Sequence, residues 1–278
     1  MKQNKTPHRL VAMLLSLILV IGMMPTTAFA ATDYELWVAG TQVTSENADN
    51  ILGNGMVSYD AELNILMLNG ANLTSGTHSG NNITAAIFAD DSIGTLTVHV
   101  TGENNIDVTQ FGTIAAGIYV YNDIIFEGDG SLSVSALSLG SEGNAVYSHT
   151  GNVTINSGTY SFTGDGTTSS YGIFANSNSG TVYVNGGTLT VSAGATGQNG
   201  TAIGGTLDFS AYADCKIIAS VNASGTPETT YIPDNQNTYR LYKYINIVPP
   251  VVVTPEYDED GFQINGDGYQ PADFAYVR

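Results

Sequence analysis

Basic residues are scarce in this chain. Its 278 residues include 7 Lys and Arg against 25 Asp and Glu, and no Lys or Arg occurs from residue 31 to residue 215. Three of the seven lie within the first 30 residues, so the rest of the chain carries a net charge of 4 − 25 = −21. Proteins bind nucleic acids and anionic lipids through Lys and Arg. The composition therefore argues against both partners and leaves neutral glycans and cations.

Cysteine and proline are also nearly absent. Cys215 is the only cysteine, so no disulfide can form within the chain, and its stability must come from a core or a stack of repeats. No proline occurs from residue 31 to residue 226. Because proline cannot donate a hydrogen bond to a β-ladder, this absence is typical of strands that are paired on both sides.

A long apolar run occurs only at the N-terminus. Lys2, Lys5 and Arg9 precede the run LVAMLLSLILVIGMM, and Ala28-Phe29-Ala30 has the small-residue pattern of a cleavage site. These features predict a secretory signal peptide over residues 1–30 and a mature chain that begins near Ala31. We therefore expect a secreted or cell-surface protein with no membrane span in its mature chain.

One short phrase recurs along the chain. It pairs a β-branched residue with an aromatic one in AAIFAD, AGIYVY, NAVYSH and YGIFAN, and TAIGG around Ile203 is a fifth copy without the aromatic. The β-branched positions follow one another at 31, 28, 27 and 30 residues. Each phrase is followed by two alternating segments with a tight turn between them, as in TVYVNGGTLTV. The chain therefore repeats one unit of three short strands.

Stacked repeats of this length predict a parallel β-helix. Each strand pairs with its equivalent in the next repeat, and the stack buries an apolar stripe that no single repeat can bury. We expect a right-handed parallel β-helix of about five to six turns. A β-sandwich is the alternative fold. Asn69, Asn156 and Asn185 occupy equivalent places and predict an amide ladder, which Thr101 and Glu127 interrupt.

The flanks of the repeats predict caps and a tail. Residues 31–64 read as an N-terminal cap, with a strand through Leu36 and Val38 and then a short helix capped by Ser45. Residues 65–248 form the predicted β-helix. Residues 249–278 read as a Pro-rich linker and an acidic tail, with further modules beyond the C-terminus as possible partners.

The chain resembles a known class of secreted protein. The segment LWVAGTQVTSENADNILGNGMVSYDAELNILMLNGANL, followed by repeats of the IFAD and VNGGTLTV types, resembles secreted right-handed parallel β-helix proteins of Gram-positive, often gut-dwelling bacteria. These are similar to carbohydrate-binding, pectate-lyase-like β-helix proteins. The resemblance covers about Asp33 to Val248 and implies polysaccharide and calcium as ligands. One architecture hosts lyases, hydrolases, binders and adhesins, so it implies fold more than activity.

An aromatic column is the candidate carbohydrate site. The aromatic residue of each phrase recurs once per turn, at Phe88, Tyr119, Tyr147 and Phe174. The preceding Ile87, Ile118, Val146 and Ile173 face the opposite side of the same strands. If the aliphatic column fills the interior, the rings point outward with open faces on which sugars could stack. The reverse arrangement, with the rings inside, stays open because both columns are apolar.

Acidic residues at one bend are the candidate metal site. Asp90 and Asp91 follow the aromatic phrase of one repeat, and Asp123 falls at nearly the same offset in the next. Stacking could bring the three carboxylates together, and flexible oxygen-rich bends suit Ca²⁺. Calcium is therefore the candidate cofactor, with a solvated acidic edge as the alternative.

No catalytic residue can be assigned from the sequence. A polysaccharide lyase needs a basic side chain, which the repeats lack, and a glycoside hydrolase needs two carboxylates that face each other. We therefore predict a secreted or cell-surface module that binds extracellular polysaccharide without catalysis. A lyase or hydrolase is one alternative, and a passive adhesin or spacer is the other.

Overall fold

The computed structural model describes residue 13 and residues 31–76, 78–80, 83–111, 113–176, 179–194, 199–212, 214–230 and 241–250. The predicted signal peptide, apart from residue 13, and the tail beyond residue 250 lie outside the described residues. The described residues from Asp33 to Pro250 form one compact unit. Among the described residues, no helix is long and apolar enough to cross a membrane.

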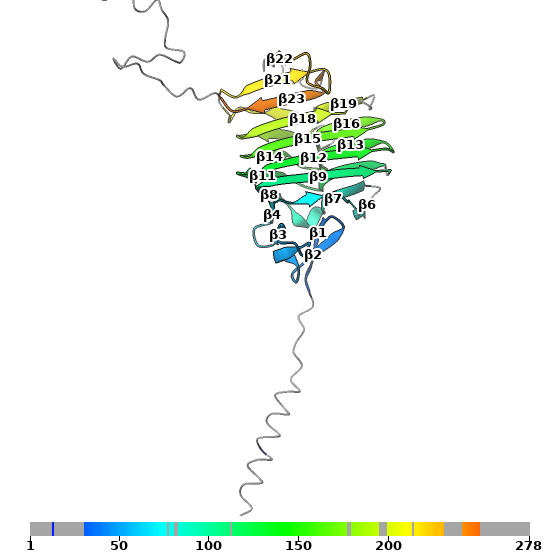
Figure 1. Ribbon diagram of the computed structural model, residues 1–278, viewed down its shortest axis with the longest axis vertical. Coiled ribbons are helices and arrows are strands. Elements are labelled where there is room, and N and C mark those ends of the chain that lie inside the picture. The colour runs from blue at the N-terminus through cyan, green and yellow to red at the C-terminus, as the bar shows by residue number, and fades with distance from the viewer. Residues whose placement is uncertain are drawn as a thin grey trace, which may run out of the picture. The chain divides into compact units, whose positions relative to one another are not determined.

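Three β-sheets share the strands of this unit, and successive turns of the chain visit them in order (Figure 1). Sheet A contains β1 (Asp33–Val38), β2 (Thr41–Thr44), β6 (His78–Gly80), β7 (Ile83–Ala89), β10 (Ile114–Val120), β13 (Glu142–Ser148), β16 (Ser169–Ala175) and β19 (Asn199–Gly204). Sheet B contains β3 (Val57–Asp60), β4 (Ile65–Asn69), β8 (Leu96–Thr101), β11 (Ile124–Gly128), β14 (Val153–Ile155), β17 (Thr181–Val184) and β20 (Thr206–Asp208). Sheet C contains β5 (Asn72–Leu73), β9 (Glu103–Gln110), β12 (Ser131–Ser138), β15 (Thr159–Gly166), β18 (Thr188–Ala193), β21 (Lys216–Ser220), β22 (Thr229–Thr230) and β23 (Tyr244–Val248).

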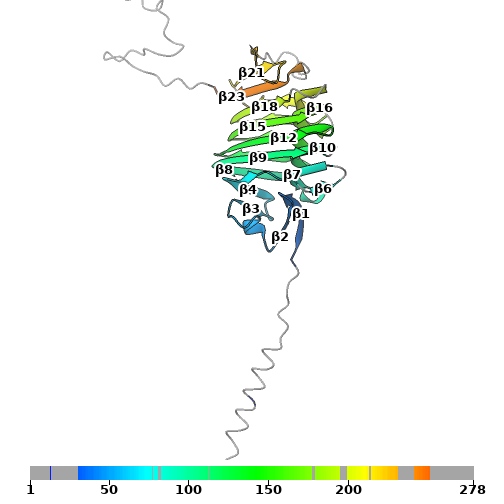
Figure 2. The ribbon, with the colours of Figure 1, turned by 45° about the vertical axis from the view of Figure 1, so that its right-hand side comes forward.

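The predicted parallel β-helix is confirmed. In sheet A, β7, β10, β13, β16 and β19 are neighbours in that order and pair in parallel. The register aligns the repeated phrases, so that Ile118 lies between Ile87 and Val146. Figure 2 shows the strands of sheets A and C stacked turn upon turn. The β-sandwich alternative is wrong, because hairpins would make neighbouring strands antiparallel.

Antiparallel strands cover both ends of the stack. At the N-terminal end, β1 pairs with β7, and β3 pairs with β4. At the other end, β23 pairs with β18 and then with β21. The expected cap helix is only one turn of 3-10 helix, Ala48–Asn50, and it begins at Asn47 rather than at Ser45. These strands cover sheets A and B at the N-terminal end and sheet C at the other end, where they remove unpaired backbone groups on which another chain could pair.

The aliphatic column fills the interior. Ile87, Ile118, Val146 and Ile173 are all 0% exposed and belong to one continuous core with Phe126, Tyr160 and Phe162. Burial of each such side chain contributes roughly 1.5–3 kcal/mol. At Gly117 and Gly172, beside this column, an added Cβ would collide with Val134 or Val191, so only glycine fits. In the other turns Ala86 and Ala145 join Ile87 and Val146 in the core, so two successive residues face inward.

Candidate functional site

The outer face of sheet C carries an ordered array of hydroxyl groups. Strict alternation in β12, β15 and β18 buries every second residue and leaves the others at the surface. The parallel register aligns three surface positions on these three strands. All nine are Ser or Thr, and we call them the hydroxyl lattice: Ser131, Ser133, Ser135, Thr159, Ser161, Thr163, Thr188, Thr190 and Ser192.

Most hydroxyls of the lattice are available to a ligand. Thr163 and Ser192 hydrogen-bond each other at 2.8 Å, and the Thr190 hydroxyl donates to Asn246 Oδ1 at 3.2 Å. The side chains of the other six have no partner among the described residues. Each hydroxyl can donate one hydrogen bond and accept two. The lattice therefore presents donors and acceptors at fixed spacings.

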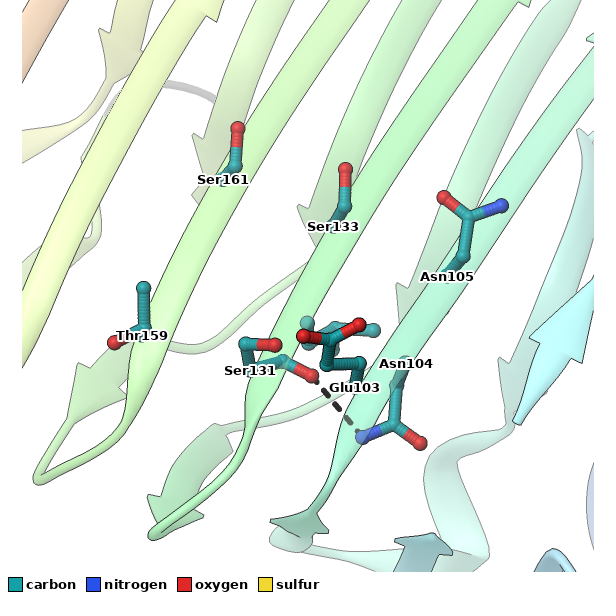
Figure 3. Close-up of a pocket in the computed structure, with 8 residues that line it drawn as sticks. Glu103, Asn104, Asn105, Ser131, Ser133, Thr159 and Ser161 are labelled. Atoms are coloured by element: carbon teal, nitrogen blue, oxygen red, sulfur yellow. Dashed lines mark hydrogen bonds between the residues drawn. The ribbon is translucent and has the colours of Figure 1, made fainter. Parts of the chain in front are cut away.

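A shallow trough of about 370 Å³ crosses the start of the lattice. Figure 3 shows its outward side chains in two rows, with Glu103, Ser131 and Thr159 in one and Asn105, Ser133 and Ser161 in the other. The rows run from strand to strand across β9, β12 and β15. Short side chains on β12 and β15 leave the surface low there. A ligand lying in the trough would therefore cross the strands rather than follow them.

Asn104 fixes the floor of the trough. This side chain is 4% exposed, and its Oδ1 accepts from the Ala71 backbone at 2.9 Å. Its Nδ2 donates to the carbonyls of Thr101 and Ser131, each at 3.0 Å. One amide thus joins three successive turns of the β-helix. Buried polar groups that are fully paired hold a single arrangement of the backbone.

Carboxylates border the trough. Glu103 lines it directly, and a second hollow that shares Glu103, Ser131 and Thr159 extends to Asp129 in the β11–β12 turn. Asp107 follows on β9, in register with Ser135 of the lattice. All three carboxylates are exposed, and none has a side-chain partner among the described residues. The site combines hydroxyl, amide and carboxylate groups, which are the groups that bind polyols through hydrogen bonds.

Of the two orientations that the sequence left open, the aromatic column takes the one outside the main core, but its ring faces are not open. Phe88, Tyr119, Tyr147 and Phe174 form a separate cluster beside sheet A and are 6%, 4%, 7% and 9% exposed. Phe88 stacks on Tyr119 at 4.9 Å between ring centroids, and Tyr147 follows at 5.2 Å. Burial raises the pKa of both the Tyr119 and the Tyr147 hydroxyl. The prediction of open faces is wrong, because adjacent turns are close enough for each ring to cover the next.

The three carboxylates predicted to bind calcium accept separate hydrogen bonds. Asp90 accepts from the Asp91 backbone at 2.7 Å, and Asp91 accepts from Asn122 Nδ2 at 3.0 Å. Asp123 accepts from the backbone of Asn152 at 2.7 Å. Among the described residues, no three His, Cys, Asp or Glu side chains form a group that could hold a metal ion. The structure does not gather the predicted set, and calcium binding stays a prediction.

The sequence analysis missed the hydroxyl lattice. Its signal was present in SLSVS, TYSFT and TLTVS, where Ser or Thr occupies every second position after a turn. Ser and Thr are common in strands and turns, so the pattern gained meaning only when the register aligned the three segments.

Comparisons of the chain with known proteins give no match. No family model, no curated protein and no solved structure matches the chain. The resemblance to secreted Gram-positive β-helix proteins rests on sequence phrases alone and stays a prediction.

Proposed function

We propose that this protein is a secreted or cell-surface module that binds an extended polysaccharide on the outer face of sheet C without catalysis. One observation carries the proposal: nine aligned Ser and Thr side chains on adjacent strands, most of them without a partner among the described residues, beside a trough that crosses two of these strands. The apolar run before residue 31 supports export.

The spacing of the lattice suits a glycan chain. Neighbouring strands lie about 4.8 Å apart, which comes close to the length of one sugar unit in an extended polysaccharide. A chain in the trough would therefore place successive sugars over β9, β12 and β15, and a longer chain would continue along the lattice over β18. The backbone that carries the hydroxyls is paired on both sides, so little ordering cost arises on binding.

Affinity should depend on the length of the ligand. The trough is shallow, and a neutral hydrogen bond contributes a net of only about 0.5–1.5 kcal/mol. Each sugar would thus add a small increment, and a chain that spans more strands would gain more of them. We expect oligosaccharide affinity to rise with length until the chain covers the lattice.

A glycoside hydrolase is the second candidate, because Glu103 and Asp129 border adjoining hollows. A hydrolase works through two carboxylates placed on either side of the bond that breaks. An assay for new reducing ends with any polysaccharide that binds would separate the two functions. A binder leaves the chain length unchanged, whereas a hydrolase shortens it.

The decisive experiment uses a glycan panel and a pair of variants. Ser133→Val together with Ser161→Val removes two central hydroxyls from the lattice. The control, Thr97→Val with Thr154→Val, removes two outward hydroxyls from sheet B. The lattice variant should lose binding and the control should keep it. Equal binding by both variants would show that the binding site is not the lattice. If the wild type binds no glycan, the remaining function is that of a passive adhesin or spacer. Calcium and chelator arms test whether calcium assists.

A further inference from the structure

Carboxylates border the trough, and no basic side chain of the described residues lines it or the adjoining hollow. Glu103, Asp107 and Asp129 border the trough and lattice, and none of these carboxylates is paired within the described residues. An ion pair on sheet B joins His99 and Glu127 and does not involve these three carboxylates. Unpaired carboxylates next to a binding surface favour a positively charged ligand and repel a negative one.

Among the described residues, the two basic side chains lie beyond the other end of the lattice. Lys216 begins β21, and Lys243 precedes β23, so both are separated from the trough by β18. No Lys or Arg occurs from residue 31 to residue 215, which includes every strand that lines the trough. The described residues therefore supply no cation for Glu103 and Asp129, and a cationic ligand would supply one.

A metal ion is a poor source of that charge. Calcium takes about six to eight oxygen ligands, and its sites usually gather several carboxylates around one point. Within the described ranges, no three His, Cys, Asp or Glu side chains form a group that could hold a metal ion. An ammonium group needs only one or two acceptors, because it donates three hydrogen bonds in different directions.

We propose that the polysaccharide bound in the trough is a cationic one, built of amino sugars whose nitrogen is not acetylated. This inference rests on the proposed function and names the ligand class of the same site. The ammonium groups would donate to the carboxylates of Glu103 and Asp129, and the ring hydroxyls would bind Ser131, Ser133 and Ser161. Charge-assisted hydrogen bonds are stronger than neutral ones, so the ammonium groups would make the site prefer amino sugars to neutral sugars.

The test compares two hexasaccharides of equal length, β-1,4-linked glucosamine and β-1,4-linked N-acetylglucosamine, by calorimetry. The measurement is made at about pH 5.5, above the usual pKa range of Asp and Glu. Glucosamine hexamer should bind roughly 3- to 10-fold more tightly, as expected for two solvent-exposed ion pairs. The difference should shrink in about 0.5 M NaCl, because salt screens exposed charges.

A pair of variants assigns the effect to the trough. Glu103→Gln with Asp129→Asn should remove the preference, whereas Glu46→Gln with Glu62→Gln makes the same charge change on the exposed N-terminal cap and should keep it. Equal affinity for the two hexamers, or a preference that survives in the trough variant, overturns the inference. If neither hexamer binds but a neutral or acidic glycan of the panel does, the cationic ligand is wrong and the proposed function stands. If no glycan binds, both the cationic-ligand inference and the proposed function are wrong.

Discussion

The outer faces of sheet A and sheet C are built from the same repeat and differ in what they expose. On sheet A the outward column is aromatic, and its members are 4–9% exposed because each ring covers its neighbours. On sheet C the outward columns are Ser and Thr, which are too short to cover one another. Side-chain size thus decides which face of a β-helix becomes a second core and which stays open to a ligand.

Loss of the rings from sheet A gives the largest expected effect on stability. Tyr119→Ala with Tyr147→Ala should lower the free energy of unfolding by several kcal/mol, since truncation of one buried aromatic side chain costs roughly 3–5 kcal/mol. Urea denaturation followed by circular dichroism measures the change. If the variant stays as stable as the wild type and loses glycan binding, the aromatic column is the glycan-binding site.

Substitution of Asn104, at the floor of the trough, should give the next largest loss of stability. Asn104→Ala leaves the Ala71 amide and the Thr101 and Ser131 carbonyls without their partner. Unpaired buried groups cost about 1–3 kcal/mol each when water cannot reach them, so we expect a loss of about 3 kcal/mol. Asn105→Ala, on the exposed side of the same strand, is the control and should change stability by less than about 0.5 kcal/mol. Similar losses in both variants would contradict the assigned role.

Alkaline pH should weaken the sheet A face and leave the lattice unaffected. Burial raises the pKa of the Tyr119 and Tyr147 hydroxyls in the folded state. Their contribution is therefore complete below the unfolded pKa of about 10 and is lost as the pH rises above it. The urea midpoint should therefore be lower at pH 11 than at pH 8, because pH 8 lies below the unfolded pKa of about 10 and pH 11 lies above it. Tyr119→Phe with Tyr147→Phe should reduce the fall, and an unchanged fall would assign it to Tyr160 or other tyrosines.

Substitutions in the lattice should have the smallest effect on stability. Ser133→Val with Ser161→Val changes two surface side chains on paired strands, and surface changes of this kind usually stay within about 0.5 kcal/mol. Thermal denaturation should therefore place the variant close to the wild type. A large loss would show that the lattice hydroxyls support the fold rather than a ligand.

Periodicity predicted the fold because the repeat spacing is a property of the sequence alone. The recurrence of the Ile118 and Val146 phrases gave the parallel alignment, which the structure confirms. The amide ladder is confirmed at one step, where Asn185 Nδ2 donates to Asn156 Oδ1 at 2.9 Å. Glu127 interrupts it, as expected, and pairs with His99 at 3.3 Å instead.

The surfaces were harder to predict than the fold. Exposure of Tyr119 depends on its distance from the rings of the neighbouring turns, which no single repeat contains. Asp91 and Asp123 fall at nearly the same offset in their repeats, yet Asp91 accepts a hydrogen bond from Asn122 and Asp123 accepts one from Asn152. The lattice emerged only from the aligned register of three strands. Sequence patterns therefore predicted the strands and their alignment, whereas packing between turns decided which column of sheet A faces inward and what the outward residues can do.

The most direct test of this account measures the dissociation constant of one bound oligosaccharide with two double variants, one from each face. Ser133→Val with Ser161→Val removes lattice hydroxyls, and Tyr119→Phe with Tyr147→Phe removes hydroxyls from sheet A while its ring stack stays in place. The account predicts about tenfold weaker binding for the lattice variant, from two lost hydrogen bonds, and no change for the aromatic variant. Weaker binding by the aromatic variant, with an unchanged lattice variant, would contradict it.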